Sequence, residues 1–311
     1  MNNTILRYEV IKLEQGQRLD TFLTKKNEDL SRNYVQTLIK EGRVWINEVL
    51  VDKCNHIVKE SDQIKLLKAE PVELEARAVN IPLDILYEDE DLLIVNKPKG
   101  MVVHPAAGHW DDTLVNALLY HCKDHLSGIN GVLRPGIVHR IDKDTTGAII
   151  VCKNDRSHQK IAEQLKEHSI TRKYVAIVHN NLKEETGTID MPLGRDPYDR
   201  RRRRIDQSEA GKRAVTHYKV LNSLNHQFNY IECQLETGRT HQIRVHMAYI
   251  GHPLLGDPFY GPKKCPFKNL QGQTLHAETI GFIHPTKEEY MEFHAPLPEY
   301  FQKLLNQLEE K

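Results

Sequence analysis

A short stretch of ionisable residues precedes an apolar run in the middle of the chain. The sequence HRIDKDTTG (139–147) places a histidine, an arginine and two aspartates within six positions, directly ahead of AIIVC (148–152). The apolar run predicts a buried strand, so the preceding loop can hold side chains on a rigid scaffold and still leave them reachable. Asp142 in this loop can act as a nucleophile or a base, or it can simply cap backbone amides beside Thr145 and Thr146.

A second segment supplies cations that such a carboxylate would need. ETGRTHQIRVH (236–246) places Arg239 and Arg244 at a predicted turn between a strand and a helix. An arginine directed at the aspartate would keep it ionised in a partly buried site, because a nearby opposite charge favours the charged carboxylate. The segment is also compatible with a helix start whose cations face phosphates, which would imply a nucleic-acid partner.

Several other chemistries lack sequence support. The five cysteines stand singly with no CxxC pair, and the 17 histidines include no HExxH motif, so zinc sites are not indicated. HAE (276–278) matches half of a zinc deaminase motif, but no PCxxC follows it. The chain also lacks a GxxxxGK[ST] phosphate loop and a GxGxxG turn. We therefore expect no metal and no cofactor.

The elements that would position these residues form a mixed pattern of strands and helices. Strands are predicted over 43–47, 91–97, 145–153, 173–179 and 230–236, and helices over 155–168 and 240–250. Strands outnumber helices and are unevenly spaced, so we expect an α+β domain rather than a regularly alternating parallel sheet.

The N-terminal part of the chain is predicted to form a separate small unit. AEPVELEARAVNIPL (69–83) has two prolines and an acidic bias, and is a candidate linker. Before it, SRNYVQTLIKEG (31–42) predicts a helix with one apolar face. Its opposite face carries Arg32, Gln36 and Lys40, which can present cations to phosphates or can form an ordinary solvated surface.

Composition sets limits on the partner and the compartment. The 311-residue chain has 43 basic and 43 acidic side chains, so overall charge gives no sign of a polyanionic partner. Such a partner must be argued from local clusters, for example the five consecutive arginines at 200–204. Apolar runs such as 148–152 are too short to span a bilayer, and the N-terminus lacks a secretory layout. We expect a cytoplasmic protein with no membrane contact.

Taken together, these segments resemble the large-subunit ribosomal pseudouridine synthases of the RluA/RluD type. The motifs that carry the resemblance are VNKPKGMVVHP (95–105), HRIDKDTTGAIIVCK (139–153), RKYVAIVH (172–179), GKRAVTHYKV (211–220), ETGRTHQIRVHMAYIGHPLLGDPFYG (236–261) and LHA (275–277). The resemblance implies a catalytic domain over 80–305 with a mixed, mainly antiparallel sheet. QRLDTFL followed by SRNYVQTLIKEGRVWIN resembles an S4 RNA-binding domain, which implies an S4 unit and linker over 1–75, with its core at about 15–65.

The resemblance also implies an activity. Pseudouridine synthases detach uracil from C1′ of a uridine within RNA, turn it and rejoin it through C5, without a metal or redox cofactor. The implied substrate is 23S rRNA at the helix 69 stem-loop, in a pre-50S particle or ribosome, with the chain acting as a monomer. The alternative is a noncatalytic RNA-binding or ribosome-assembly factor that has the same fold.

The family's site residues can be carried over by motif. Asp142 matches the catalytic aspartate, which either adds to C1′ or removes a proton from C2′. Tyr174 matches the aromatic residue that stacks on the flipped base, and Arg239 matches the arginine that pairs with the aspartate. The supporting roles implied are apolar lining for Ile243, pocket wall for Lys97 and His104, and RNA contacts for Arg32, Lys40, Arg140 and Arg244. The arginine run at 200–204 lies where relatives carry a variable basic insertion, and either grips phosphates or forms a solvated loop.

Overall fold

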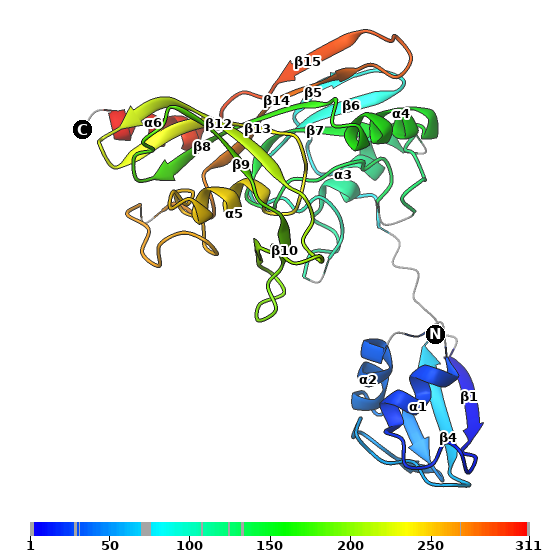
Figure 1. The fold of residues 1–311 in the computed structure, drawn as a ribbon. Helices are drawn as coiled ribbons and strands as arrows, with labels where there is room; N and C mark the ends of the chain where they lie inside the picture. Colours follow the sequence, from blue (N-terminus) through cyan, green and yellow to red (C-terminus); the bar gives the residue numbers. More distant parts are fainter. Residues whose placement is uncertain are drawn as a thin grey trace. The chain divides into compact units, whose positions relative to one another are not determined.

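The computed structural model describes residues 3–27, 30, 32–69, 76–106, 108–123, 125–131, 134–267 and 269–309. The chain divides into two compact units, residues 1–74 and 75–311, which Figure 1 colours from blue to cyan and from cyan to red. Residues 70–75 of the predicted linker lie outside the described residues. No helix in the described ranges is both long enough and apolar enough to cross a bilayer.

The N-terminal unit combines two helices with a small antiparallel sheet. Its elements are β1 (Asn3–Glu9), α1 (Leu19–Lys26), α2 (Arg32–Lys40), β2 (Val44–Ile46), β3 (Val49–Leu50) and β4 (Gln63–Ala69), and the strands lie in the order β1-β4-β2-β3. The apolar face predicted for α2 is buried, and Leu38 packs with Phe22 of α1 and Leu66 of β4. The predicted N-cap of this helix, Ser31, lies outside the described residues.

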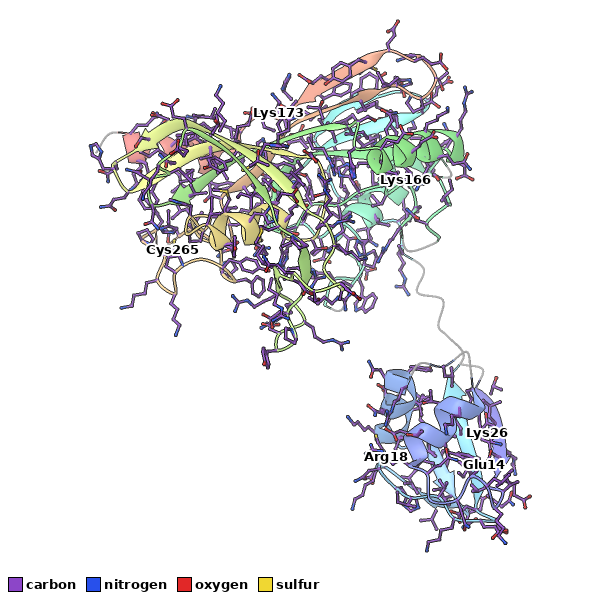
Figure 2. The ribbon with its side chains drawn as sticks, in the orientation of Figure 1. Glu14, Arg18, Lys26, Lys166, Lys173 and Cys265 are labelled. Atoms are coloured by element: carbon purple, nitrogen blue, oxygen red, sulfur yellow. The ribbon has the colours of Figure 1, made fainter. Side chains whose placement is uncertain are left out.

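The polar face of α2 is partly tied to α1. Asp20 of α1 has a completely buried carboxylate, which accepts hydrogen bonds from Arg32 (Nη2–Oδ2, 3.1 Å) and Gln36 (Nε2–Oδ2, 2.7 Å). Arg18, on the surface of this unit in Figure 2, donates to the same carboxylate at 3.0 Å. Burial alone would raise the pKa of Asp20, but these hydrogen bonds hold it well below its usual range. Of the three polar residues predicted to face RNA, only Lys40 is not held by this network.

The second unit is built on one large mixed sheet. Its elements are β5 (Ile85–Glu88), β6 (Leu92–Lys97), α3 (Leu114–Cys122), β7 (Thr146–Cys152), α4 (Asp155–Lys166), β8 (Thr171–His179), β9 (Thr186–Asp190), β10 (Leu193–Arg195), β11 (Arg203–Ile205), β12 (Val215–Leu224), β13 (Phe228–Leu235), α5 (Gln242–Tyr249), β14 (Leu275–Ile283), β15 (Tyr290–His294) and α6 (Glu299–Glu309). The sheet order is β5-β6-β7-β14-β8-β13-β12-β9, with β15 also paired to β14, and β10 and β11 form a separate ribbon. Only β7 and β14 pair in parallel among the described strands, which confirms the predicted mixed, mainly antiparallel sheet.

The central strand β7 is buried on both faces. Ile150 packs on one side with Ile161 of α4, while Ile149 packs on the other side with Leu118 of α3. An apolar run without alternation is the expected sequence for such a strand. The position of β7 is fixed further by Gly147 (φ +109°), where an added Cβ would lie 2.2 Å from the carbonyl oxygen of Ala277 in β14. The loop that carries Asp142 therefore enters a rigid strand.

Candidate active site

Asp142 lies in the loop that leads into β7, at the edge of a cavity of ≈480 Å³. Its backbone carbonyl accepts from the amide of Thr145 at 3.1 Å, which closes the loop into a turn. The side chain is 17% exposed, so a carboxylate oxygen can be reached from the cavity. The turn and the strand after it together fix where that oxygen points.

The cation that contacts Asp142 is Arg244, in the first turn of α5. Its Nη1 donates to Oδ2 of Asp142 at 2.8 Å, while Nε and Nη2 donate to the two carboxylate oxygens of Asp257 at 2.7 and 3.0 Å. The arginine side chain is only 3% exposed. Burial would lower the pKa of Arg244, but the bonds to Asp257 and the charge of Asp142 raise it, so the guanidinium stays charged. The expected contact of Arg244 with RNA is wrong, because its donors are directed at these two carboxylates.

Arg239 does not pair with Asp142, so that prediction is also wrong. Its exposed side chain lies in the turn before α5, and its Nε donates to the carbonyl of Arg213 at 3.1 Å. The helix begins at Gln242, which places residue 244 on the buried side of the first turn and leaves residue 239 outside it. Nevertheless, Arg239 lines the same cavity as Asp142.

His241 is a further member of the site that the sequence did not indicate. It adopts a left-handed backbone conformation (φ 59°) just before α5, and its Nε2 lies 3.7 Å from Oδ2 of Asp142. On the other side, its Nδ1 is 2.9 Å from the hydroxyl of Tyr260. Burial lowers the pKa of His241 to about 4, so the imidazole is neutral at pH 7. Non-glycine residues in this conformation tend to occur at functional sites.

The cavity beside Asp142 has an apolar wall suited to a flat ring. Tyr174 of β8, Leu235 of β13, Ile243 of α5 and Leu275 of β14 line it. Tyr174 is buried, and this burial raises the pKa of its hydroxyl. The structure thus brings Tyr174 and Ile243 together with Asp142, although they are far apart in the sequence.

Lys97, which was predicted to form the pocket wall, lies below the site. Lys97 is completely buried beneath the loop, where its Nζ donates to the carbonyls of Pro98, Met101 and Lys143 at 2.8, 2.9 and 3.0 Å. Its predicted place in the pocket wall is wrong, since it lines neither cavity next to Asp142. Burial lowers the pKa of Lys97 to about 7. Its role is to tie the loop to the turn after β6.

His104 and Arg140 border a smaller cavity of ≈280 Å³ that Asp142 also lines. Burial and the nearby cations Arg134 and Arg140 lower the pKa of His104 to about 4. Arg140 is exposed and lines both cavities. His139, next to it, turns inward, and its Nε2 accepts from the amide of Ile150 at 3.0 Å. The two adjacent residues therefore differ: His139 anchors the loop, and Arg140 faces the open side.

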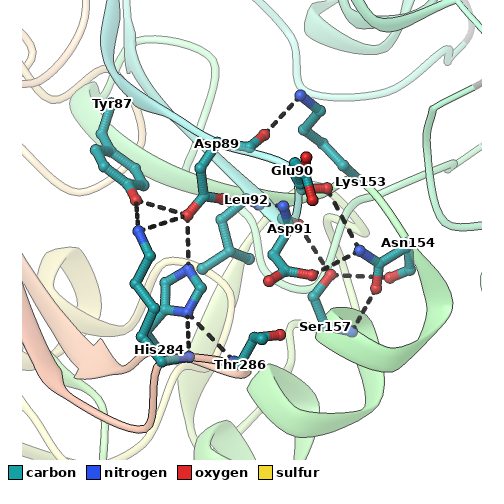
Figure 3. A network of polar contacts seen from close by, with 11 residues as sticks. Tyr87, Asp89, Glu90, Asp91, Leu92, Lys153, Asn154, Ser157, His284 and Thr286 are labelled. Atoms are coloured by element: carbon teal, nitrogen blue, oxygen red, sulfur yellow. Dashed lines mark hydrogen bonds and ion pairs between the residues drawn. The ribbon is translucent and has the colours of Figure 1, made fainter.

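Two groups of possible metal-ligand type lie elsewhere in the described residues, namely Glu88–His121–Cys122 and Asp89–Asp91–His284. In the second group, shown in Figure 3, one oxygen of Asp89 already receives bonds from Tyr87, His284 and Lys287 at 2.6, 2.9 and 3.1 Å. Burial would raise the pKa of Asp89, but hydrogen bonds from Tyr87 and two backbone amides lower it. This network joins the β5–β6 turn to the segment after β14.

Comparison with known proteins gives matches that cover nearly the whole chain. A model of the RNA pseudouridylate synthase family matches residues 91–249, and a model of the S4 domain matches residues 17–64. An uncharacterised RNA pseudouridine synthase of Bacillus subtilis, YlyB, is 52% identical over 95% of each chain. The ribosomal large subunit pseudouridine synthase D of Zymomonas mobilis is 48% identical over 94% of each chain. The structure of human RNA pseudouridylate synthase domain containing 1 superimposes with a TM-score of 0.56 at 25% identity, covering 78% of this chain and 98% of that one.

Proposed function

Because this chain belongs to the RNA pseudouridylate synthase family and carries an S4 domain, we propose that it isomerises uridine in 23S rRNA with Asp142 as the catalytic group. The observation that carries the assignment is the arrangement of Asp142, Arg244 and Asp257 at the mouth of a cavity lined by Tyr174. This arrangement holds the Asp142 carboxylate in a defined direction at a site large enough for a nucleobase.

In the proposed reaction, the target uridine leaves the RNA stack and its base lies against Tyr174 in the cavity. Asp142 then either adds to C1′ as the N1–C1′ bond breaks, or removes a proton from C2′ as the same bond breaks. The uracil turns and C5 bonds to C1′, which releases the Asp142 oxygen in the first route and returns the proton to C2′ in the second. C5 then loses its proton to solvent, and N1 takes one up. Arg244 pairs with the carboxylate and orients it before the first step, and the apolar wall excludes water from the detached base.

The substrate assignment extends what the relatives' names say of those proteins. Relatives from Zymomonas mobilis and Haemophilus influenzae, 48% and 39% identical, are named ribosomal large subunit pseudouridine synthase D. On this basis we propose 23S rRNA as the substrate. The resemblance of the sequence motifs to the S4-bearing RluD-type synthases adds the helix 69 stem-loop, within a pre-50S particle or ribosome in the cytoplasm, to this proposal. The chain is proposed to act as a monomer.

Replacing the catalytic carboxylate tests the assignment. Asp142→Asn should abolish isomerisation and leave RNA binding intact, because the change removes the nucleophile or base but hardly alters side-chain size. Primer extension after carbodiimide treatment of rRNA, from cells with the wild-type or the variant protein, reports modification at each uridine. Asp144→Asn, two positions along the same loop, is the matched control and should retain activity. Turnover near the wild-type level in Asp142→Asn would refute the assignment.

The N-terminal domain is proposed to bind RNA phosphates through Lys40 and through Arg32, whose side chain is 54% exposed although it is paired with Asp20. Removal of residues 1–74 should therefore weaken binding to rRNA without disabling the chemistry on a short stem-loop at saturating enzyme. The truncated protein should also show a shallower dependence of affinity on salt, by about one slope unit per lost phosphate contact. An unchanged slope would mean that this domain does not contact phosphates.

A further inference from the structure

Beside the catalytic cavity lies another of ≈370 Å³ whose lining contains four cations and no carboxylate. The cations are Arg195, Arg203, Lys212 and Arg239, and Thr240 adds a hydroxyl group. Arg239 lines the catalytic cavity as well, so the two spaces adjoin. Because the chain has equal numbers of acidic and basic side chains, a lining of one sign is a local feature and not a consequence of composition.

The β10–β11 ribbon brings two of these cations face to face. Arg195 is the direct cross-strand neighbour of Arg203, while Leu193 of the same ribbon packs into a buried apolar cluster. Figure 1 shows the ribbon projecting from the body of the catalytic unit. Like charges directly opposite each other on neighbouring strands destabilise a ribbon, so this pair has a cost in the free protein. A bound anion would remove that cost.

The other two cations are held in place by the backbone. Lys212 pairs with Leu193 through two backbone hydrogen bonds of 2.9 and 3.0 Å, which sets the start of its side chain beside β10. Arg239 uses its Nε to donate to the carbonyl of Arg213, and this bond does not involve the two terminal nitrogens of the guanidinium. No ion pair within 4.0 Å joins any of these four cations to a carboxylate in the described part of the chain. Burial and then the charge of Arg195 lower the pKa of Arg203, and the smaller effects of Tyr260 and Asp142 in the opposite direction do not offset them.

We propose that this cavity binds a phosphodiester of the RNA backbone next to the uridine held in the catalytic cavity. A phosphate offers acceptor oxygens to several arginine and lysine donors at once, and it supplies the negative charge that the opposed arginines lack. The contact fixes the strand on one side of the flipped nucleotide. The proposal rests on the RNA synthase function, but not on the identity of the modified uridine.

Neighbouring arginines in the run at 200–204 provide a matched comparison. Arg203 lines the cavity, whereas Arg204 pairs with Gly194 and points to the opposite face of the ribbon. Backbone hydrogen bonds lower the pKa of Asp196, and hydrogen bonds from Ser208 lower that of Asp206. The charge of Arg204 acts in the same direction on both, so Arg204 has acidic neighbours. Arg203→Gln and Arg204→Gln therefore remove the same charge from adjacent positions, with only the first facing the cavity.

The experiment measures RNA affinity over a range of salt concentrations, on a stem-loop that the wild-type enzyme modifies. Arg203→Gln should weaken binding about tenfold and reduce the salt slope by about one unit, whereas Arg204→Gln should change affinity by less than about twofold. Since Arg203→Gln relieves a like-charge pair, its melting temperature should equal or exceed that of the wild type. Equal losses of affinity in the two variants would overturn the proposal in favour of a diffuse electrostatic effect. A lower melting temperature would assign Arg203 to the fold instead.

A second measurement locates the contact on the RNA. Single phosphates around the target uridine are replaced by uncharged methylphosphonates on 2′-deoxy residues. The affinity of each RNA is then measured for the wild-type protein and for Arg203→Gln. Replacement of one particular phosphate should weaken the binding of RNA to the wild type but leave its binding to Arg203→Gln unchanged. Such an energetic coupling between the phosphate and Arg203 is expected for a direct contact. If no position couples to Arg203 while inorganic phosphate raises only the wild-type melting temperature, the cavity takes a free anion and the proposal fails. Failure of Asp142→Asn to stop isomerisation would refute the catalytic assignment alone, because this cycle measures binding.

Discussion

Replacing Arg244 by lysine tests the central feature of the site. The arginine joins Asp142 to Asp257 through three hydrogen bonds, all from a side chain that is 3% exposed. An ammonium group keeps the charge but cannot reproduce a planar fork that reaches two carboxylates. At least one charge-assisted bond is lost, at about 1.5–3 kcal/mol. We therefore expect Arg244→Lys to lower the free energy of unfolding by about 2–4 kcal/mol, towards the value for a broken buried ion pair.

The expected effect on catalysis is larger than the effect on binding. Without its oriented partner, the carboxylate of Asp142 can move by an ångström or so, and a displacement of this size costs about 10²-fold in rate. The assay is release of tritium from RNA labelled at C5 of uridine, under single-turnover conditions, because the reaction removes the proton from that carbon. RNA affinity, measured separately, should change little.

Arg239 provides the control, because it borders the same cavity without touching Asp142. Arg239→Lys keeps the positive charge proposed to face a phosphate and leaves the ion pair at Arg244 untouched. At saturating RNA it should therefore keep the single-turnover rate within about threefold of wild type. The opposite result, a slow Arg239→Lys enzyme and a near-normal Arg244→Lys enzyme, would refute the pairing and restore the sequence-based choice of Arg239.

Three further outcomes follow from other parts of the structure. Lys97→Met should lower the free energy of unfolding by about 2–5 kcal/mol and slow the reaction, because three buried carbonyls lose their donor. Thermal melting measures the first effect and tritium release the second. An unchanged rate would mean that Lys97 does not position the loop of Asp142. Asp20→Asn should destabilise the N-terminal domain by about 1–2 kcal/mol at pH 7. The pKa of Asp20 is lowered in the folded state, so its contribution to stability is present above about pH 4 and is lost at lower pH. The stabilities of wild type and variant, measured by denaturant unfolding, should therefore converge in acid. A difference that stays constant with pH would contradict the ion pairs. Prolonged EDTA treatment should leave the isomerisation rate unchanged, because Arg244 supplies the cation at Asp142, whereas inactivation that zinc reverses would contradict a metal-free reaction.

The sequence predicted the sheet and its elements well where burial produces a simple pattern. The run at 148–152 is apolar throughout because β7 is covered on both faces, and such a run identifies a strand without knowledge of its neighbours. The helix predicted over 31–42 has the expected apolar side for the same reason. Local patterns of this kind need only the chain itself.

Contacts between distant segments could not be predicted in the same way. Arg239 and Arg244 are equally plausible partners for a carboxylate until the first residue of α5 is known, because the helix fixes the direction of Arg244 in its first turn but not that of Arg239, which precedes it. Asp257, which orients Arg244, lies 13 positions further along the chain and carries no local signal of that role. Lys97 likewise gave no sign of being buried, since isolated lysines are almost always exposed.

The second carboxylate also explains how the site can tolerate the reaction. Whether Asp142 adds to C1′ or takes a proton from C2′, it loses its negative charge during the cycle. An arginine that was paired with Asp142 alone would then be a buried cation without a partner, at a cost of several kcal/mol (about 3–5). Arg244 keeps two hydrogen bonds to the fully buried Asp257 throughout, so it remains neutralised and in position. The carboxylate can thus change its charge while the group that orients it stays fixed, which is a requirement of both chemical routes.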